Sequence, residues 1–272
     1  MPKLSLRVLL STAAVCASPL TVSAATLDEA PGAVGLLIVS GGNEIRIGAH
    51  RGMAKLARDV AEAGHPTLRF DRRGIGDSEG ENGGFTSSGP DLEAAVAAFK
   101  VECPALTRIV AFGNCDAASA LMLHRPDGVD GVVLANIWVF EPVDDLPAPA
   151  VIKARYFNQL GDPKSWLRLF TGGVNLRKLA GGLLRLAQPP APSGLSHRVA
   201  DGMAAFPGPI HILLAERDGT ALAFAEEWQK PEFGPVCERA DVKVTKLDSA
   251  SHSFARDADY AELKAAILTA LG

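Results

Sequence analysis

The chain of 272 residues has the length of one large α/β domain. Hydrophobic residues make up 47% of it and charged residues 21%, which is ordinary for a globular enzyme. A formal net charge of −4 and the lack of a long basic run argue against nucleic acid or an anionic membrane surface as a partner. No uninterrupted apolar stretch reaches the roughly eighteen residues of a spanning helix, so we expect no stable membrane insertion.

The N-terminus fits two interpretations. Lys3 and Arg7 precede an apolar run, and the small residues up to Ala24 resemble the cleavage site of a secretory signal. Pro19 interrupts this stretch, however, and residues 18–27 are equally typical of a strand. Cleavage after Ala24 would also leave only a short segment before the first strong core strand. We therefore expect a first hairpin in a cytoplasmic protein, with export as the alternative.

Strand-like and helix-like segments alternate along the rest of the chain. Short apolar runs predict strands over 34–40, 66–70, 107–112, 131–135, 209–215 and 242–247. Apolar residues at helical spacing predict helices over 52–63, 91–99, 116–123, 220–228 and 260–271. This alternation predicts an α/β fold, with a mostly parallel central sheet flanked by helices.

The pattern changes over residues 141–205, which are rich in proline and contain helical, basic pieces but no obvious strand. We interpret this stretch as a helical cap inserted between a first core part, 12–140, and a second, 206–272. A pair of ordinary surface helices is the alternative. We expect an apolar lining that selects the acyl part of a substrate, although core packing would produce the same spacing; its residues are Ile152, Tyr156, Trp166, Leu169 and Phe170.

The strongest single feature is the sequence Phe-Gly-Asn-Cys-Asp-Ala over 112–117, where a predicted strand ends and a helix begins. It fits a nucleophile elbow, in which a strained turn requires small neighbours, here Gly113 and Ala117, on either side of the nucleophile Cys115. The helix dipole favours a thiolate there. The usual motif has serine as nucleophile and glycine at its last position, so simple serine-esterase behaviour is not expected. A buried cysteine at a tight turn is the alternative.

The other cysteines are Cys16, Cys103 and Cys237, which are widely scattered and form no CxxC pair. We therefore expect neither a zinc site nor a disulfide framework.

Two further residues complete a possible triad. Asp218 and His252 each follow a predicted strand, in the order nucleophile, acid, base that is typical of α/β-hydrolases. Each lies past the carboxyl end of its strand, where parallel sheets have their ligand crevice. We predict Cys115 as nucleophile, His252 as base and Asp218 as the orienting acid. Glu216 lies in the same loop as Asp218, and we expect it to be solvated or paired with a nearby arginine.

Two glycine-containing loops support this interpretation. The Ser-Gly-Gly-Asn-Glu stretch over 40–44 can supply backbone N–H groups to an oxyanion, and we assign this role to Gly42 or Asn43 together with Asp116. Residues 71–78 fit the D-x-R-G-x-G-x-S turn, whose Asp and Arg can bind neighbouring loops. A phosphate cradle is not supported, because no GK[ST] follows and no GxGxxG opens a helix. We expect no metal and no cofactor.

With these motifs in view, the chain resembles an α/β-hydrolase over almost its full length. More narrowly, it is similar to the exosortase A system-associated hydrolases of the first type, through residues 36–46, 48–53, 70–78, 113–117 and 216–218. The resemblance implies a bacterial protein that is linked to exopolysaccharide production and protein sorting and acts on an ester or thioester. It also implies a first hairpin over residues 14–28, with residues 1 to 11 as an extension and no signal.

We therefore predict an acyl hydrolase, either an esterase or a thioesterase, whose partner is a small-molecule acyl ester or thioester. Acyl transfer to an alcohol or amine and dienelactone-type cleavage use the same residues and stay open. A non-catalytic binding protein of the same fold is the alternative from another class. The sequence indicates neither the physiological substrate nor the oligomeric state.

Overall fold

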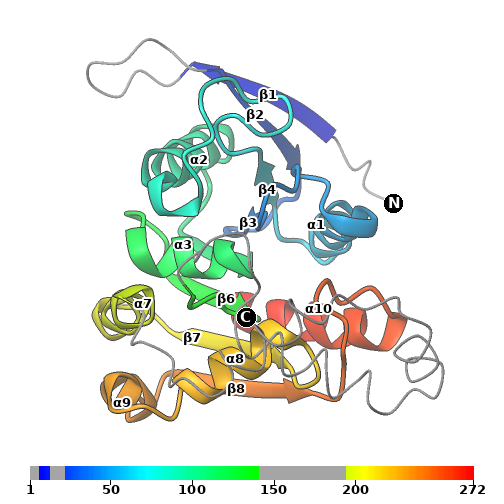
Figure 1. The fold of residues 1–272 in the computed structure, drawn as a ribbon. Coiled ribbons are helices and arrows are strands. Elements are labelled where there is room, and N and C mark those ends of the chain that lie inside the picture. Colours follow the sequence, from blue (N-terminus) through cyan, green and yellow to red (C-terminus); the bar gives the residue numbers. More distant parts are fainter. Residues whose placement is uncertain (1–5, 13–21, 141–193) are drawn as a thin grey trace, which may run out of the picture.

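The computed structural model describes residues 6–12, 22–140 and 194–272. These residues form one sheet of eight strands in the order β1-β2-β4-β3-β5-β6-β7-β8 (Figure 1). The strands are β1 (Leu6–Thr12), β2 (Val22–Asp28), β3 (Val34–Val39), β4 (Thr67–Phe70), β5 (Arg108–Asn114), β6 (Gly131–Ala135), β7 (Ile210–Ala215) and β8 (Val242–Leu247). Only the pairs β1–β2 and β2–β4 are antiparallel, so the predicted mostly parallel sheet is confirmed.

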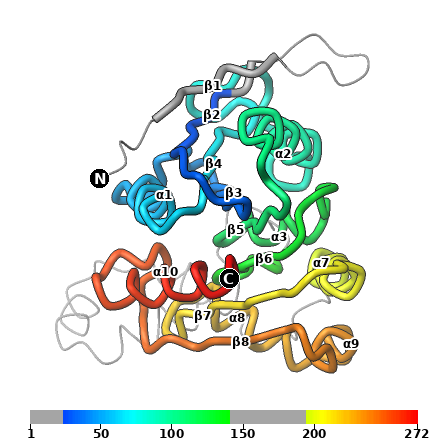
Figure 2. Tube along the Cα trace, turned by 180° about the vertical axis from the view of Figure 1, so that it is seen from behind, coloured from blue at the N-terminus to red at the C-terminus, as the bar shows by residue number. Residues whose placement is uncertain are grey.

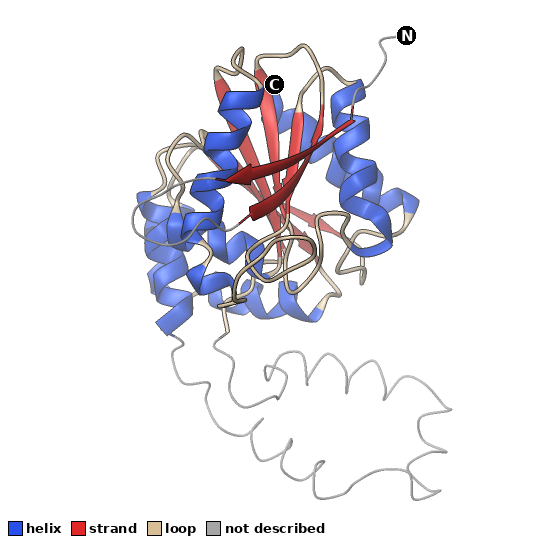
Figure 3. Ribbon diagram, turned by 90° about the horizontal axis from the view of Figure 1, so that it is seen from above, coloured by secondary structure: helices blue, strands red, loops and turns tan. Residues whose placement is uncertain are grey.

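Helices cover both faces of this sheet, which makes three layers (Figure 3). The α-helices are α1 (Gly52–Glu62), α2 (Gly89–Glu102), α3 (Asp116–His124), α7 (Gly194–Ala205), α8 (Gly219–Glu227), α9 (Gly234–Cys237) and α10 (Asp257–Leu271). Short 3-10 turns lie at η1 (Ala49–Arg51), η2 (Phe85–Ser87) and η3 (Pro231–Phe233). Helices α1 and α10 pack on one face, and α2, α3, α7 and α8 pack on the other (Figure 2).

The central strands are apolar throughout because both of their faces are buried. In β3, Leu36 and Ile38 belong to the core cluster under α1 and α10, whereas Leu37 and Val39 belong to the cluster on the opposite face. This division follows the two-residue period of a strand. A strand that is buried on both sides therefore has a continuous apolar sequence instead of an alternating one.

The predicted segments from residue 34 onward lie close to observed elements, and β8 has the predicted bounds. The N-terminal hairpin is the exception. Its first strand is β1, which pairs with β2 from Leu6↔Asp28 to Thr12↔Val22, so the expectation of an extension over residues 1 to 11 is wrong. The resemblance implies a hairpin over residues 14–28, whereas β2 pairs with the earlier segment Leu6–Thr12. No helix within the described ranges is both long and apolar enough to cross a membrane.

Most of the predicted cap, 141–193, lies outside the described residues, and so do its five proposed lining side chains, Ile152, Tyr156, Trp166, Leu169 and Phe170. The remaining part of the predicted cap, 194–205, forms helix α7. Its buried residues Leu195, Val199 and Met203 belong to the core cluster shared with α3. This helix therefore forms part of the layer that covers the sheet.

Candidate active site

Cys115 occupies the sharp turn between β5 and α3. Its backbone has φ 61° and ψ −128°, a conformation that residues with a side chain rarely adopt. A Cβ atom built on Gly113 would lie 2.8 Å from the backbone carbon of Ala117, so the turn leaves no room for a side chain at that position. The helix begins at the next residue, Asp116, whose N–H has no acceptor within its own helix. The turn thus places the thiol at the N-terminus of α3.

Asp218 and His252 are in direct contact. Their atoms Oδ2 and Nδ1 lie 3.1 Å apart, and the aspartate side chain is 11% exposed. Asp218 is also the N-cap of α8, and its Oδ2 accepts hydrogen bonds of 3.0 Å from the N–H groups of Thr220 and Ala221. The helix end therefore fixes the carboxylate, which in turn orients the imidazole ring.

The histidine is held between two acidic side chains. Burial by itself lowers the pKa of His252, but hydrogen bonds and charge interactions with Asp218 and Cys115 outweigh burial and raise this pKa to about 10. The ring lies beside both predicted partners, and both favour its protonated form.

Glu216, the competing acid, takes no part in this arrangement. Its side chain is 48% exposed, and its nearest cation is Lys246, at 3.8 Å from Oε1 to Nζ. We had expected an arginine as its partner if it was paired at all. Arg217 instead pairs with Asp248, just after β8, and Arg256 pairs with Asp259 in α10. Lys246 lies on β8, the strand that pairs with β7. Solvation of Glu216 is as predicted.

Two asparagines that the sequence analysis missed hold the loop of His252. Asn114 and Asn136 each donate a hydrogen bond of 3.1 Å from Nδ2 to the backbone oxygen of His252. Asn136 Oδ1 accepts from the N–H of Ala215 at 2.9 Å, and this residue is completely buried with φ 42°. These bonds tie the ends of β5, β6 and β7 to the histidine. A signal was present, since Asn136 directly follows a predicted strand on the edge that carries the triad.

The first glycine-containing loop lies against the nucleophile turn. A Cβ atom on Gly41 would meet the backbone oxygen of Asn114 at 2.4 Å and Cys115 Cβ at 3.4 Å, so only glycine allows this approach. The N–H of Gly42, a predicted oxyanion donor, makes a hydrogen bond of 2.6 Å to Asp116 Oδ1. The side chain of Asn43, another candidate, accepts from Asn82 at 2.8 Å. The loop therefore lies next to Cys115, and the Gly42 N–H is bonded to the Asp116 side chain.

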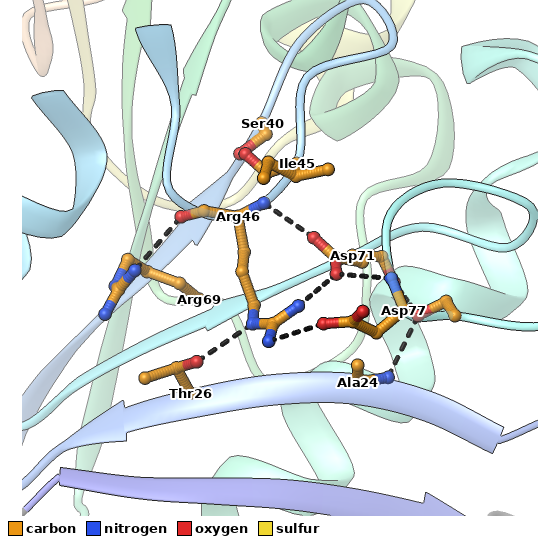
Figure 4. A network of polar contacts seen from close by, with 9 residues as sticks. Ala24, Thr26, Ser40, Ile45, Arg46, Arg69, Asp71 and Asp77 are labelled. Carbon is orange, nitrogen blue, oxygen red and sulfur yellow. Dashed lines mark hydrogen bonds and ion pairs between the residues drawn. The ribbon is translucent and has the colours of Figure 1, made fainter. Parts of the chain in front are cut away.

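A buried ion pair holds this loop to its neighbours (Figure 4). The guanidinium of Arg46 binds the fully buried carboxylate of Asp71, and the Arg46 N–H donates to Asp71 Oδ1 at 2.6 Å. Arg46 also donates to Thr26 in β2 at 2.9 Å and pairs with Asp77 at 2.9 Å. A Cβ on Gly76 would lie 2.3 Å from Asp71 Oδ2, so glycine is required there. The predicted structural role of the 71–78 turn is confirmed by these contacts.

The described residues contain no group of three or more His, Cys, Asp or Glu side chains that could hold a metal ion. Cys115, Asp218 and His252 lie at the carboxyl edge of the sheet together with Asn114 and Asn136. Their chemistry is that of a nucleophile with a proton carrier, which suits attack on an electrophilic carbon.

Comparison with known proteins identifies the fold. No protein-family model matches the sequence, and no curated protein matches it either. The structure is similar to an esterase from Pyrococcus furiosus (TM-score 0.66, 15% identity, 99% of this chain and 94% of that chain). It is also similar to a hydrolase from Pseudomonas aeruginosa (0.58, 19%, 98% and 98%). A third match is the mouse α/β-hydrolase domain-containing protein 10 (0.54, 15%, 97% and 97%). The chain therefore has the α/β-hydrolase fold.

Proposed function

We propose that this protein is an acyl hydrolase that cleaves an ester or thioester through a cysteine nucleophile. The observation that carries the proposal is the position of His252, whose ring interacts with Asp218 on one side and with the Cys115 side chain on the other. A base between an acid and a nucleophile on one edge of an α/β-hydrolase sheet is the arrangement used for acyl transfer. Esterases and hydrolases among the structural neighbours support the same class.

The chemistry follows from the proton on His252. The Cys115 thiolate attacks the carbonyl carbon, and the resulting oxyanion accepts hydrogen bonds from backbone N–H groups. The His252 imidazolium then gives its proton to the departing alkoxide or thiolate, which leaves an acyl-cysteine. Neutral His252 next removes a proton from water, the hydroxide attacks the acyl carbon, and the Cys115 thiolate leaves. This step releases the carboxylic acid and restores the thiolate and the protonated histidine. Asp218 holds the imidazole ring in place throughout.

Turnover of short-chain nitrophenyl esters and acyl-CoA thioesters tests this proposal. We expect Cys115→Ala to lose turnover by several orders of magnitude, as nucleophile variants of triads do. Cys237→Ala, which removes an exposed cysteine remote from the elbow, is the matched control and should keep the wild-type rate. Intact-mass measurement after rapid mixing should detect an acyl adduct on the wild type and on Cys237→Ala, but not on Cys115→Ala. Equal rates for wild type and Cys115→Ala would exclude this cysteine from the mechanism.

The same measurement separates the other candidate functions. Addition of a sugar alcohol acceptor would yield an acylated acceptor if the acyl-cysteine is resolved by transfer, and only free acid if it is resolved by water. A non-catalytic binding protein would show no adduct, and iodoacetamide would alkylate its Cys115 no faster than a free cysteine.

A narrower part of the proposal concerns the biological setting. The similarity of the loop and elbow sequences to exosortase A system-associated hydrolases supports an enzyme linked to bacterial exopolysaccharide production. Deletion of the gene should then change the amount or acylation of surface polysaccharide, and a Cys115→Ala allele should reproduce that change. Unaltered polysaccharide in both strains would contradict the link without affecting the proposed chemistry.

We also propose that the protein stays in the cytoplasm. The hairpin β1–β2 supports this, because signal cleavage after Ala24 would remove β1 and part of β2, including Val22. The remaining part of β2 would then have lost its edge partner in the sheet. Cell fractionation together with N-terminal sequencing tests the point, and a mature chain that begins at Ala25 would refute it.

A further inference from the structure

The carboxylate of Asp116 accepts a hydrogen bond from the Gly42 N–H, which the proposed reaction needs as an oxyanion donor. The Gly42 N–H donates to Asp116 Oδ1 at 2.6 Å, and this aspartate side chain is only 17% exposed. An oxygen anion at that position takes the place of the oxyanion that would form on a substrate. A carbonyl oxygen can therefore receive the Gly42 N–H only after the carboxylate has moved.

A buried arginine lies beside this contact. The Nη2 atom of Arg72 donates to the backbone oxygen of Gly42 and lies 3.8 Å from Asp116 Oδ2. The Arg72 side chain is 6% exposed, and its Nη1 atom is buried with no hydrogen-bond partner. An unpaired buried donor of this kind is uncommon and costly in folded proteins. Arg72 thus offers the carboxylate of Asp116 a second position close to its present one.

We propose that Arg72 is a positioning residue which takes up the Asp116 carboxylate when a substrate enters, and so frees the Gly42 N–H for the oxyanion. The inference rests on the proposed acyl hydrolysis. In the substrate-free state the carboxylate binds Gly42, and in the substrate-loaded state it forms a two-point ion pair with the guanidinium. The planar guanidinium matches a carboxylate at two donors, and the unpaired Nη1 becomes satisfied.

The proposed exchange also keeps the Gly41–Gly42 loop in position before a substrate binds. While the carboxylate binds Gly42, the loop of Gly41 stays in contact with the elbow, and no water molecule has to fill the donor position. Arg72 holds the carbonyl group of Gly42 in the same loop, so the loop keeps its place while the N–H changes partner. Only the side chain of Asp116 has to rotate.

Two reactions of Cys115 provide the test. Acylation by p-nitrophenyl acetate forms an oxyanion, whereas alkylation by iodoacetamide forms none. The ratio of the two single-turnover rates is the readout, because it cancels changes in thiolate reactivity. The proteins are wild type, Asp116→Ala, Arg72→Met and the double variant. Arg73→Met is the matched control, because Arg73 lies in the same turn but pairs with Asp91.

We expect Asp116→Ala to raise the ratio about tenfold, since a charged hydrogen bond no longer has to be broken. Arg72→Met should lower it about tenfold, because the carboxylate then has no cation to receive it. The double variant should match Asp116→Ala, and Arg73→Met should match the wild type. A ratio for Asp116→Ala at or below the wild-type ratio would overturn the inference. So would a double variant as slow as Arg72→Met, since Arg72 would then only support the loop.

A measurement without substrate tests the position of the carboxylate even if the Arg72 variants fold poorly. The amide proton of Gly42 in the wild type should resonate downfield in a ¹H–¹⁵N NMR spectrum because of its bond to a carboxylate, and it should move upfield in Asp116→Ala. An unchanged Gly42 signal would contradict the inference. If Cys115 alkylates but no variant acylates, the proposed hydrolysis is wrong, whereas the Gly42 signal still decides where the carboxylate lies.

Discussion

The side-chain amide of Asn136 donates a hydrogen bond of 3.1 Å to the backbone oxygen of His252 and accepts one of 2.9 Å from the N–H of Ala215. It therefore connects the loop of the base to the strand that leads to the acid. We predict that Asn136→Ala destabilises the protein by about 1–3 kcal/mol, because the buried Ala215 N–H loses its acceptor. Turnover should fall as well, because His252 is less well fixed.

Urea unfolding and ester turnover check this prediction. The control is Gln229→Ala, which removes an exposed carboxamide and should change the free energy of unfolding by no more than about 0.5 kcal/mol. A variant of Asn136 with wild-type stability would show that the amide does not satisfy the backbone groups around it.

The second prediction concerns pH. Partners in the folded protein raise the pKa of His252 from 6.5 to about 10. A raised pKa stabilises the fold fully below the unfolded value, and this stabilisation is lost as pH rises through the folded value. The difference in free energy of unfolding between wild type and Asp218→Asn should therefore be largest near pH 6 and decline towards pH 10. A difference that grows with pH would contradict the assignment.

An NMR titration of the His252 ring gives an independent check. Asp218→Asn and Cys115→Ala should each lower its pKa, because both partners raise it in the wild type. An unchanged value in Cys115→Ala would mean that the sulfur and the ring do not interact.

The third prediction distinguishes the two acidic residues of the loop after β7. Asp218→Asn should lower turnover by about four orders of magnitude, as loss of the orienting acid does in other triads. Asparagine is also a good N-cap, so α8 should stay intact and the loss should not come from unfolding. Glu216→Gln, at an exposed position, should keep nearly normal turnover. Turnover assays together with circular dichroism would reveal the reverse pattern if Glu216 were the acid.

The fourth prediction concerns the support of the oxyanion loop. Asp71→Ala should destabilise the protein by about 3–5 kcal/mol, because Arg46, only 13% exposed, would lose its buried partner. Asp77→Ala is the matched control: it also pairs with Arg46, but its side chain is 71% exposed, so it should cost about 1 kcal/mol or less. Denaturant midpoints measure both changes. Similar costs for the two variants would show that burial does not control the strength of this network.

The sequence was sufficient to place the three proposed triad residues at one edge of the sheet, because each follows the end of a predicted strand. A parallel sheet brings the carboxyl ends of its strands to one edge, so Cys115, Asp218 and His252 meet without further information. Contacts that depend on side-chain direction were not predictable. The bond from Asn136 to His252 spans 116 positions, and that from Gly42 to Asp116 spans 74. Neither forms part of a local pattern.

The N-terminal hairpin shows a different limit. The apolar residues of 8–17 are compatible with more than one strand position, and only the register against β2 selects Leu6–Thr12. A one-residue shift of a strand moves every side chain to the opposite face, so the choice depends on the whole sheet. Strand β8, by contrast, has the bounds predicted from the sequence.

The order of the reactive groups along the chain has a consequence for biosynthesis. Cys115 leaves the ribosome long before Asp218 and His252, which reach it only through the last two strands of the sheet, β7 and β8. Contacts between segments so far apart in sequence form late in folding. In the proposed mechanism, a nascent chain therefore carries Cys115 without the histidine that activates it. Synthesis itself thus delays reactivity until the sheet is nearly complete.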